Sequence, residues 1–210
     1  MTTNELAAAE AELTAAWLCG DAARAEAAEA RVNQLAAAQR TEATLHQAAL
    51  WYAEQGLKVF PLQPGSKIPF PRSHGCLDAS SMRDVVDGWW ETSPDANIGI
   101  ATGHLVDVVD VDGHPGQVSR AKHWDDIFGR IEADQVAKVL TPRPGGMHIY
   151  VPATGEGNGA GIVPGVDYRG KGGYVVAPPS VIAPGGKDTP GRYQFLGTPR
   201  LAGLTQSGAA

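Results

Sequence analysis

The chain has 210 residues, 43% of them hydrophobic, and a formal net charge of −6. This length and composition suit one medium-sized globular domain with a small appendage. Two cysteines do not make a disulfide framework, no run of 18 apolar residues is present, and the N-terminus lacks the pattern of a secretion signal. We therefore expect a cytoplasmic protein that makes no contact with a membrane.

The negative charge is unevenly distributed along the chain. Residues 1–140 carry 11 basic and 20 acidic groups, whereas residues 141–200 carry 6 basic and 3 acidic groups. The overall charge argues against a protein that coats duplex nucleic acid, because such binding neutralises many phosphates. The basic excess in 141–200 is compatible with a local site for a phosphate-bearing ligand, held weakly and in a salt-sensitive way.

The first 40 residues read as two alanine-rich helices, 3–18 and 21–39. Gly20-Asp21 between them is a stop and restart signal. Apolar residues recur at helical spacing and give each helix one apolar face. We predict a helical hairpin that packs on the main domain or on a partner. Surface packing or dimerisation is favoured over a docking role.

The next segment alternates helices and short strands. A helix is expected around 42–55 and a strand at 58–61, followed by a loop that contains Lys67. A second helix is expected near 81–91, with Ser80 or Ser81 as its N-cap. Further strands are predicted at 97–102 and 105–112.

The pattern after residue 112 predicts one helix at 118–128 and then mostly strands, at 135–140, 147–152, 166–168, 174–177 and 192–196. Mixed helices and mostly antiparallel strands indicate an α+β fold. We divide the chain into the hairpin (1–40), a main domain (41–197) and a flexible tail (198–210).

The strand at 105–112 ends in Asp110-Val-Asp112-Gly113. Side chains alternate along a strand, so Asp110 and Asp112 share a face about 6.6 Å apart. At an effective dielectric of about 20, two unit charges at that distance repel by roughly 2.5 kcal/mol. A divalent cation between them reverses this cost, and Mg²⁺ prefers such oxygen ligands. The alternative is that the two aspartates simply end a strand and begin a turn.

Two downstream segments favour the metal interpretation. The segment 141–151 runs from a glycine turn into an apolar strand that carries His148, and the segment 165–180 places Asp167 on a strand before a basic glycine hairpin. Three such strands could bring these groups to one edge of a sheet. A buried histidine satisfied by a hydrogen bond is the alternative for His148. A zinc site at His74 and Cys76 is disfavoured, because structural zinc needs four ligands.

These residues resemble the Prim-Pol domain of bifunctional DNA primase/polymerases, in the archaeo-eukaryotic primase superfamily. The likeness runs from about 44 to 197. Asp110 and Asp112 match the family's acidic-x-acidic motif, Gly146-Met147-His148 its small-x-His motif, and Val166-Asp167 its apolar-Asp motif. The segments 169–174 and 177–180 are also very similar to the family's own.

The resemblance implies a primase-type fold, with a small α/β module joined to an RRM-like module and the active site in the cleft between them. It implies template-directed nucleotidyl transfer in DNA replication, for which we expect a phage or mobile element as the setting. Asp110, Asp112 and Asp167 would be the catalytic residues and would bind two divalent ions, Mg²⁺ or Mn²⁺.

The remaining site residues are expected around the nucleotide and the template. His148 would contact the phosphates of the incoming nucleotide, and Arg143, Arg169, Lys171 and Gly146 are further candidates for nucleotide binding. Lys67 and Arg72 are candidates for template contact. Glycines 170, 172 and 173 would let the hairpin approach phosphate. Tyr174 either stacks on a base or, as the favoured interpretation, packs on its neighbour.

The expected partners are a single-stranded DNA template, nucleoside triphosphates and a separately encoded helicase. Many family members continue into a helicase or helix-bundle region, so we expect autonomous priming to need a partner. One alternative is a weakly catalytic scaffold that binds nucleotide or DNA. The other is a haloacid-dehalogenase-type phosphatase, which the motif at 108–113 resembles, although the late acidic pair of that family is missing.

Overall fold

The computed structural model describes residues 3–39, 43–112 and 134–204, and its fold is α+β, as the sequence predicts. The helices in this part are α1 (Thr3–Leu18), α2 (Ala22–Gln39), α3 (Leu45–Glu54), a short 3₁₀ turn η1 (Gly75–Asp78) and α4 (Arg83–Thr92). The strands are β1 (Val59–Leu62), β2 (Asn97–Ala101), β3 (Val106–Val111), β4 (Ala137–Leu140), β5 (Met147–Pro152), β6 (Gly159–Val163), β7 (Val166–Arg169), β8 (Tyr174–Ala177), β9 (Val181–Ile182), β10 (Gly191–Arg192) and β11 (Gln194–Leu196).

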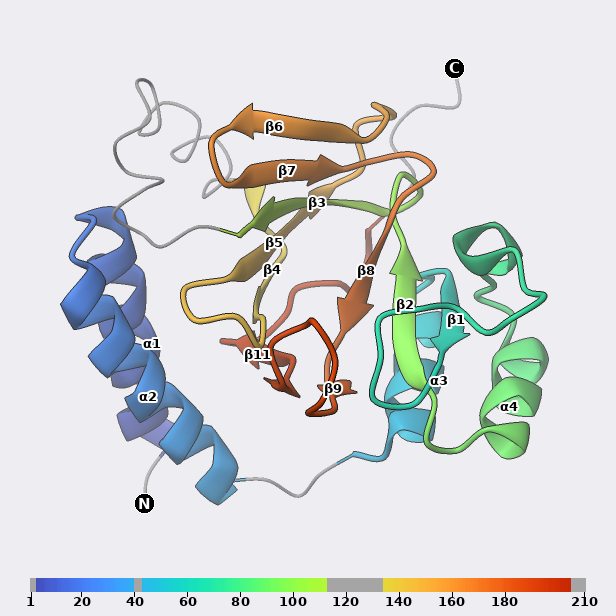
Figure 1. The fold of residues 1–210 in the computed structure, drawn as a ribbon, viewed down its shortest axis with the longest axis horizontal. Helices are drawn as coiled ribbons and strands as arrows, with labels where there is room; N and C mark the ends of the chain where they lie inside the picture. Colours follow the sequence, from blue (N-terminus) through green and yellow to red (C-terminus); the bar gives the residue numbers. More distant parts are fainter. Residues whose placement is uncertain (1–2, 40–42, 113–133, 205–210) are drawn as a thin grey trace.

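Helices α1 and α2 form the predicted hairpin. Gly20 has a φ of 69°, a left-handed conformation that ends α1 without the steric cost of a Cβ. Asp21 immediately precedes α2, and its carboxylate accepts a hydrogen bond from the Arg24 backbone N–H at 3.0 Å. The hairpin lies along one side of the molecule, next to the large sheet, with α3 and α4 on the far side (Figure 1). It therefore packs on the main domain.

Two antiparallel sheets make up most of the described strands. The smaller has the order β1-β2-β8, and the larger has the order β11-β4-β5-β3-β7-β6. A two-stranded pair, β10-β9, lies apart from both. Strand β3 is rich in valine, which suits a pleated surface, and it lies inside the large sheet between β5 and β7.

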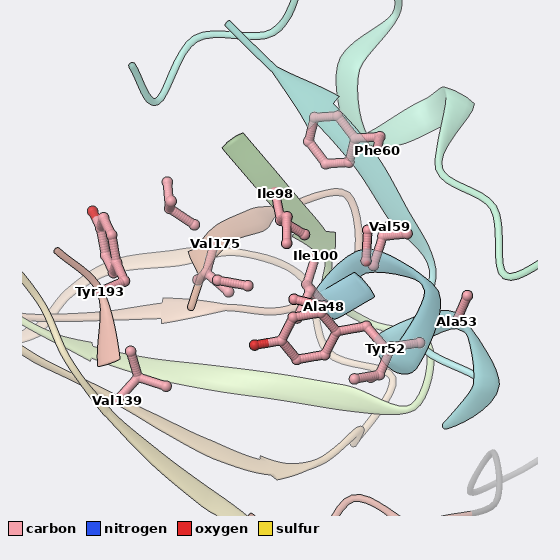
Figure 2. Close-up of a cluster of buried hydrophobic side chains, with 14 of the residues drawn as sticks. Ala48, Tyr52, Ala53, Val59, Phe60, Ile98, Ile100, Val139, Val175 and Tyr193 are labelled. Atoms are coloured by element: carbon pink, nitrogen blue, oxygen red, sulfur yellow. The ribbon is translucent and has the colours of Figure 1, made fainter. Parts of the chain in front are cut away.

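Each face of the large sheet contributes apolar residues to a different core. One core lies between the hairpin and the sheet and includes Leu13, Val32, Val109 and Val111. The other joins the opposite face of the sheet to α3, α4 and the small sheet. Figure 2 shows part of this second core, where residues of α3, β1, β2 and β8 meet. Because both faces are covered, β3 is buried along its whole length.

Several local expectations differ from the structure. The N-cap of α4 is Met82, and no side chain caps the helix. The Ser80 hydroxyl instead accepts a hydrogen bond from the Met82 N–H, which precedes the helix. The strand expected at 192–196 is split into β10 and β11 at Tyr193, whose N–H bonds outside this pair, to Ser180. Strands β6 and β9 were not predicted, since one is glycine-rich and the other has only two residues.

The expected flexible tail is packed in its first half. Leu201 is 1% exposed within the main core, and the Arg200 N–H donates to the Val136 carbonyl at 2.7 Å. Residues 205–210 and the helix expected at 118–128 lie outside the described residues. None of the described helices combines the length and the apolar character that crossing a membrane requires.

Candidate functional site

Register in the large sheet places three polar residues in one row. Asp110 of β3 is directly opposite His148 of β5 and directly opposite Asp167 of β7. Directly paired residues of antiparallel strands point to the same face. Alternation adds Asp112, two residues beyond Asp110, to that face. The row lies on the face opposite the hairpin.

The three carboxylates converge, as predicted. One oxygen from each of Asp110, Asp112 and Asp167 lies within 4.8 Å of the others, and among the described residues this is the group of acids, histidines or cysteines that could hold a metal ion. Such spacing fits a hard divalent cation, whose oxygen ligands lie about 2.0–2.6 Å from the ion. The donor set therefore fits Mg²⁺ or Mn²⁺.

Two guanidinium groups contact the same carboxylates. The Arg169 side chain donates to Asp110 Oδ2 at 3.0 and 3.2 Å and to Asp167 Oδ2 at 3.0 Å. Arg143 pairs with Asp112 at 2.9 Å. Arg169 lies on the acidic face because it follows Asp167 by two positions on β7. The cluster of negative charge is thus partly neutralised by the protein itself.

The surroundings of His148 disfavour the charged form of its ring. Its side chain is 7% exposed, and burial lowers its pKa below the usual value despite the nearby Asp110 and Asp112. Its Nε2 atom is 3.5 Å from Asp110 Oδ1, a polar contact rather than an ion pair for a neutral ring. Its Nδ1 atom is buried without a hydrogen-bond partner. The ring of Tyr193 lies 5.6 Å away, centroid to centroid, and fixes one side of the imidazole.

These residues line a cavity of about 400 Å³, the active-site cavity hereafter. Asp110, Asp112, Arg143, His148 and Arg169 form part of its wall. The loop between β1 and α4 supplies a cation to the same wall, and this cation pairs with an acid of the β9–β10 turn at 3.1 Å. That pair is Lys67 and Asp188. The cavity thus combines an acidic face with several cations.

Some of the predicted residues lie elsewhere. Asp167, Gly146, Lys171 and Arg72 are not in the lining of the active-site cavity. The backbone N–H of Lys171 donates to the Glu156 carbonyl. The pKa of His104 is lowered mainly by burial, and the charges of Lys58 and Lys171 lower it further. The Lys171 side chain is exposed. Its expected contact with the triphosphate stays a prediction.

The glycines around the site have packing reasons for their identity. A Cβ on Gly146 would lie 2.2 Å from the Thr141 hydroxyl, inside the turn that carries Arg143. A Cβ on Gly170 or Gly173 would lie 2.3 Å from an oxygen of the segment 156–158. Gly172 differs: it has a φ of 84°, open space around its Cα and a place in the cavity wall. Of this hairpin, Gly172 and Gly173 reach the cavity.

Sequence reasoning missed several wall residues. Tyr193, Asn158, Lys187 and Thr189 line the active-site cavity but belong to no motif. Tyr193 sits between two short strands, and Lys187 lies in a polar turn. No local pattern distinguishes them from ordinary turn residues. Tyr174 also lines the cavity, yet its ring packs edge-on against Phe60 at 5.3 Å, as the favoured interpretation predicted.

Comparison with known proteins adds one finding. Residues 49–206 match the family model described as the bifunctional DNA primase/polymerase N-terminal domain, Prim-Pol. No curated protein matches the chain. The match includes the motif at 108–113, so the phosphatase interpretation of that motif is not retained. The hairpin of α1 and α2 lies outside the matched region.

Proposed function

Because this chain belongs to the Prim-Pol family of bifunctional DNA primase/polymerases, we propose that it catalyses template-directed nucleotidyl transfer. The observation that carries the proposal is the row of His148, Asp110 and Asp167 across three adjacent strands, with Asp112 on the same face. His148, Asp110 and Asp112 line a cavity that also holds cations, and Asp167 is joined to Asp110 through Arg169. An acidic wall and nearby cations together suit a metal-bound triphosphate.

Asp110, Asp112 and Asp167 would hold the divalent ions. When bound, these ions would lower the pKa of the attacking hydroxyl and balance the charge of the triphosphate and of the leaving pyrophosphate. The number of ions, two, is part of the proposal. The carboxylates themselves supply the negative potential that draws cations to this edge of β3.

The basic and imidazole groups would bind and orient the nucleotide. Arg143 is half exposed at the cavity rim and can move from Asp112 to a phosphate without losing burial. His148, held neutral by burial, keeps one donor nitrogen and one acceptor nitrogen, so it can donate to a phosphate oxygen. Lys67 and Lys187 also line the cavity and would neutralise charge there.

The arrangement of the two sheets is compatible with a primase-type architecture. The small sheet with α3 and α4 would be the α/β module, and the large sheet would be the RRM-like module. The active-site cavity takes wall residues from both, such as Tyr174 and Val175 from β8 and Asp110 from β3. Single-stranded DNA and nucleoside triphosphates are the proposed substrates, and a helicase is a proposed partner.

The test is nucleotide incorporation on a single-stranded template, with and without primer, in Mg²⁺ or Mn²⁺. The native chain is compared with the double variant Asp110→Ala/Asp112→Ala. We expect metal-dependent product that the double variant does not make, and the unprimed reaction separates priming from extension. If the native chain binds triphosphate but makes no product under any condition, the scaffold alternative replaces this proposal.

A further inference from the structure

A second cavity lies beside the active-site cavity. It measures about 530 Å³ and is formed by α3, the Pro178-Pro179 segment and the strands β10 and β11. This size is within the range of sites that hold small organic groups. Four of its wall residues are aromatic: Trp51, Tyr52, Tyr193 and Phe195. We call it the aromatic groove.

Trp51 gives the aromatic groove its accessible ring. It is 37% exposed, and it is the one aromatic residue among the large hydrophobic side chains that are exposed in the described part of the chain. Its ring packs on Tyr52 at 5.0 Å and edge-on against Phe195 at 6.2 Å. Trp51 is thus held in place by two rings while part of its own surface remains open.

The aromatic groove and the active-site cavity share a wall. Tyr193 lines both, and its ring contacts His148 on the active-site side. The neighbouring residue Arg192 also lines the groove, and no acidic side chain is among the described residues of its wall. The groove, on the other side of Tyr193, therefore places aromatic surface and a cation next to the active-site cavity.

This chemistry suits a nucleobase. Aromatic side chains bind unpaired bases by stacking, whatever the sequence, and a nearby cation favours the phosphate that follows. An apolar peptide would also fit the apolar wall. It would not need to lie next to a nucleotide site, whereas a template strand must. The adjacency of the two cavities at Tyr193 thus favours nucleic acid over protein as the occupant.

We propose that the aromatic groove binds an unpaired base of the single-stranded template next to the active-site cavity, with Trp51 as its stacking platform. This inference rests on the proposed function and adds a template-binding surface to it. The surface is separate from Lys67 and Arg72, which the sequence suggested for this role. Trp51 and Phe195 come from distant parts of the chain, so no local motif indicates the groove.

The experiment measures binding of a fluorescein-labelled homothymidine oligonucleotide by anisotropy at fixed low salt. An oligonucleotide of about 20 nucleotides exceeds the roughly 4–16 nucleotides that a single-strand-binding fold covers. We expect Trp51→Ala to weaken binding about 5- to 100-fold, as for loss of one base stack. We expect Trp51→Phe to stay within about threefold of the native chain, because a phenyl ring still stacks.

A matched control is Leu77→Ala. Leu77 is 79% exposed and lines neither cavity, so its loss removes apolar surface without touching the groove. Native affinity in Trp51→Ala would overturn the inference and leave an apolar protein segment as the occupant to test. An equal loss in Leu77→Ala would overturn it too. If the native chain incorporates nucleotide and Trp51→Ala binds template normally, only the groove proposal is refuted. If the native chain neither incorporates nucleotide nor binds DNA, both proposals are refuted.

A second measurement covers the case in which Trp51→Ala does not fold. The native chain is irradiated with single-stranded DNA that carries 5-iodouracil, and the cross-linked peptides are identified by mass spectrometry. The inference predicts cross-links to Trp51, Tyr193 or Phe195. Cross-links confined to other parts of the chain would overturn it.

Discussion

The two faces of strand β3 differ in what they carry and in what covers them. Toward the hairpin, Val109 and Val111 are buried in an apolar core, and the single acid of that face, Asp107, is fully buried and hydrogen-bonded. On the opposite face, Asp110 and Asp112 lie in the wall of a cavity beside other charged groups. One strand thus serves packing on one side and chemistry on the other.

This difference shows where the molecule gains and loses stability. Burial of valine and leucine between the hairpin and the sheet is favourable, by roughly 25 cal/mol for each Å² of apolar surface removed from water. Three carboxylates within 4.8 Å of one another repel, and Arg169 and Arg143 offset only part of that repulsion. Such local conflict is typical of functional sites.

The largest expected effect separates the two faces directly. Asp110→Asn removes one carboxylate from the cation-binding group, so we expect nucleotide incorporation to fall on the order of 10³-fold. We expect the thermal midpoint to stay the same or to rise, because a repulsive charge is removed while Arg169 keeps Asp167. Primer-extension rates and a thermal scan measure the two effects.

The matched control is Asp107→Asn, three residues earlier on the other face. Asp107 Oδ2 accepts hydrogen bonds from Thr154 and Tyr168, whereas Oδ1 is buried without a partner. An amide there can keep its oxygen on these donors but buries an unpaired NH₂ group, which costs about 1–3 kcal/mol of stability. At temperatures below the thermal midpoint of the variant, its rate of nucleotide incorporation should remain near that of the native chain. An Asp107→Asn variant as inactive as Asp110→Asn would break the comparison.

The next effect tests the packing face. Leu13 of α1 is fully buried against the sheet, and Leu13→Ala should lower the free energy of unfolding by about 2–5 kcal/mol, measured by urea denaturation. Ile68 provides the control because it is 58% exposed. Ile68→Ala should change the free energy of unfolding by less than about 0.5 kcal/mol. Equal effects of the two variants would mean that the hairpin contributes little to the stability of the domain.

A smaller effect concerns Arg169, which shares two carboxylates with the proposed cation. At about 6 Å in a water-like dielectric, a unit charge and a divalent ion repel by about 1.4 kcal/mol, or about tenfold in the dissociation constant. Arg169→Met should therefore bind Mn²⁺ about tenfold more tightly in calorimetric titration, and Arg169→Lys should bind it as the native chain does. Weaker binding by Arg169→Met would show that Arg169 supports the ion.

The smallest expected effect lies on the outer surface of the hairpin. Arg24 pairs with Glu12 across α1 and α2 at 2.5 Å, but both side chains are almost half exposed, so water screens the pair. Arg24→Ala should leave the thermal midpoint unchanged within error, at low and at high salt. A clear drop at low salt alone would indicate that this pair helps to hold the hairpin together.

Some of the site could be predicted because it depends on local geometry. Alternation along a strand places Asp110 and Asp112 on one face whatever the fold, and glycine with aspartate at 20–21 ends one helix and begins the next. The α+β class and the family follow from such patterns and motifs. Cap position and strand length were less predictable, because a competing hydrogen bond, as at Ser80, decides them.

The sequence by itself determined the acidic strand, the helical hairpin and the family. Tertiary structure alone decided which strands flank β3 and in which register, and so brought His148 and Asp167 opposite Asp110. It also placed Arg169 on the carboxylates and Lys171 outside the cavity. The physical reason is that strand pairing and the burial of two sheet faces join residues far apart in the chain, and no local pattern encodes those partners.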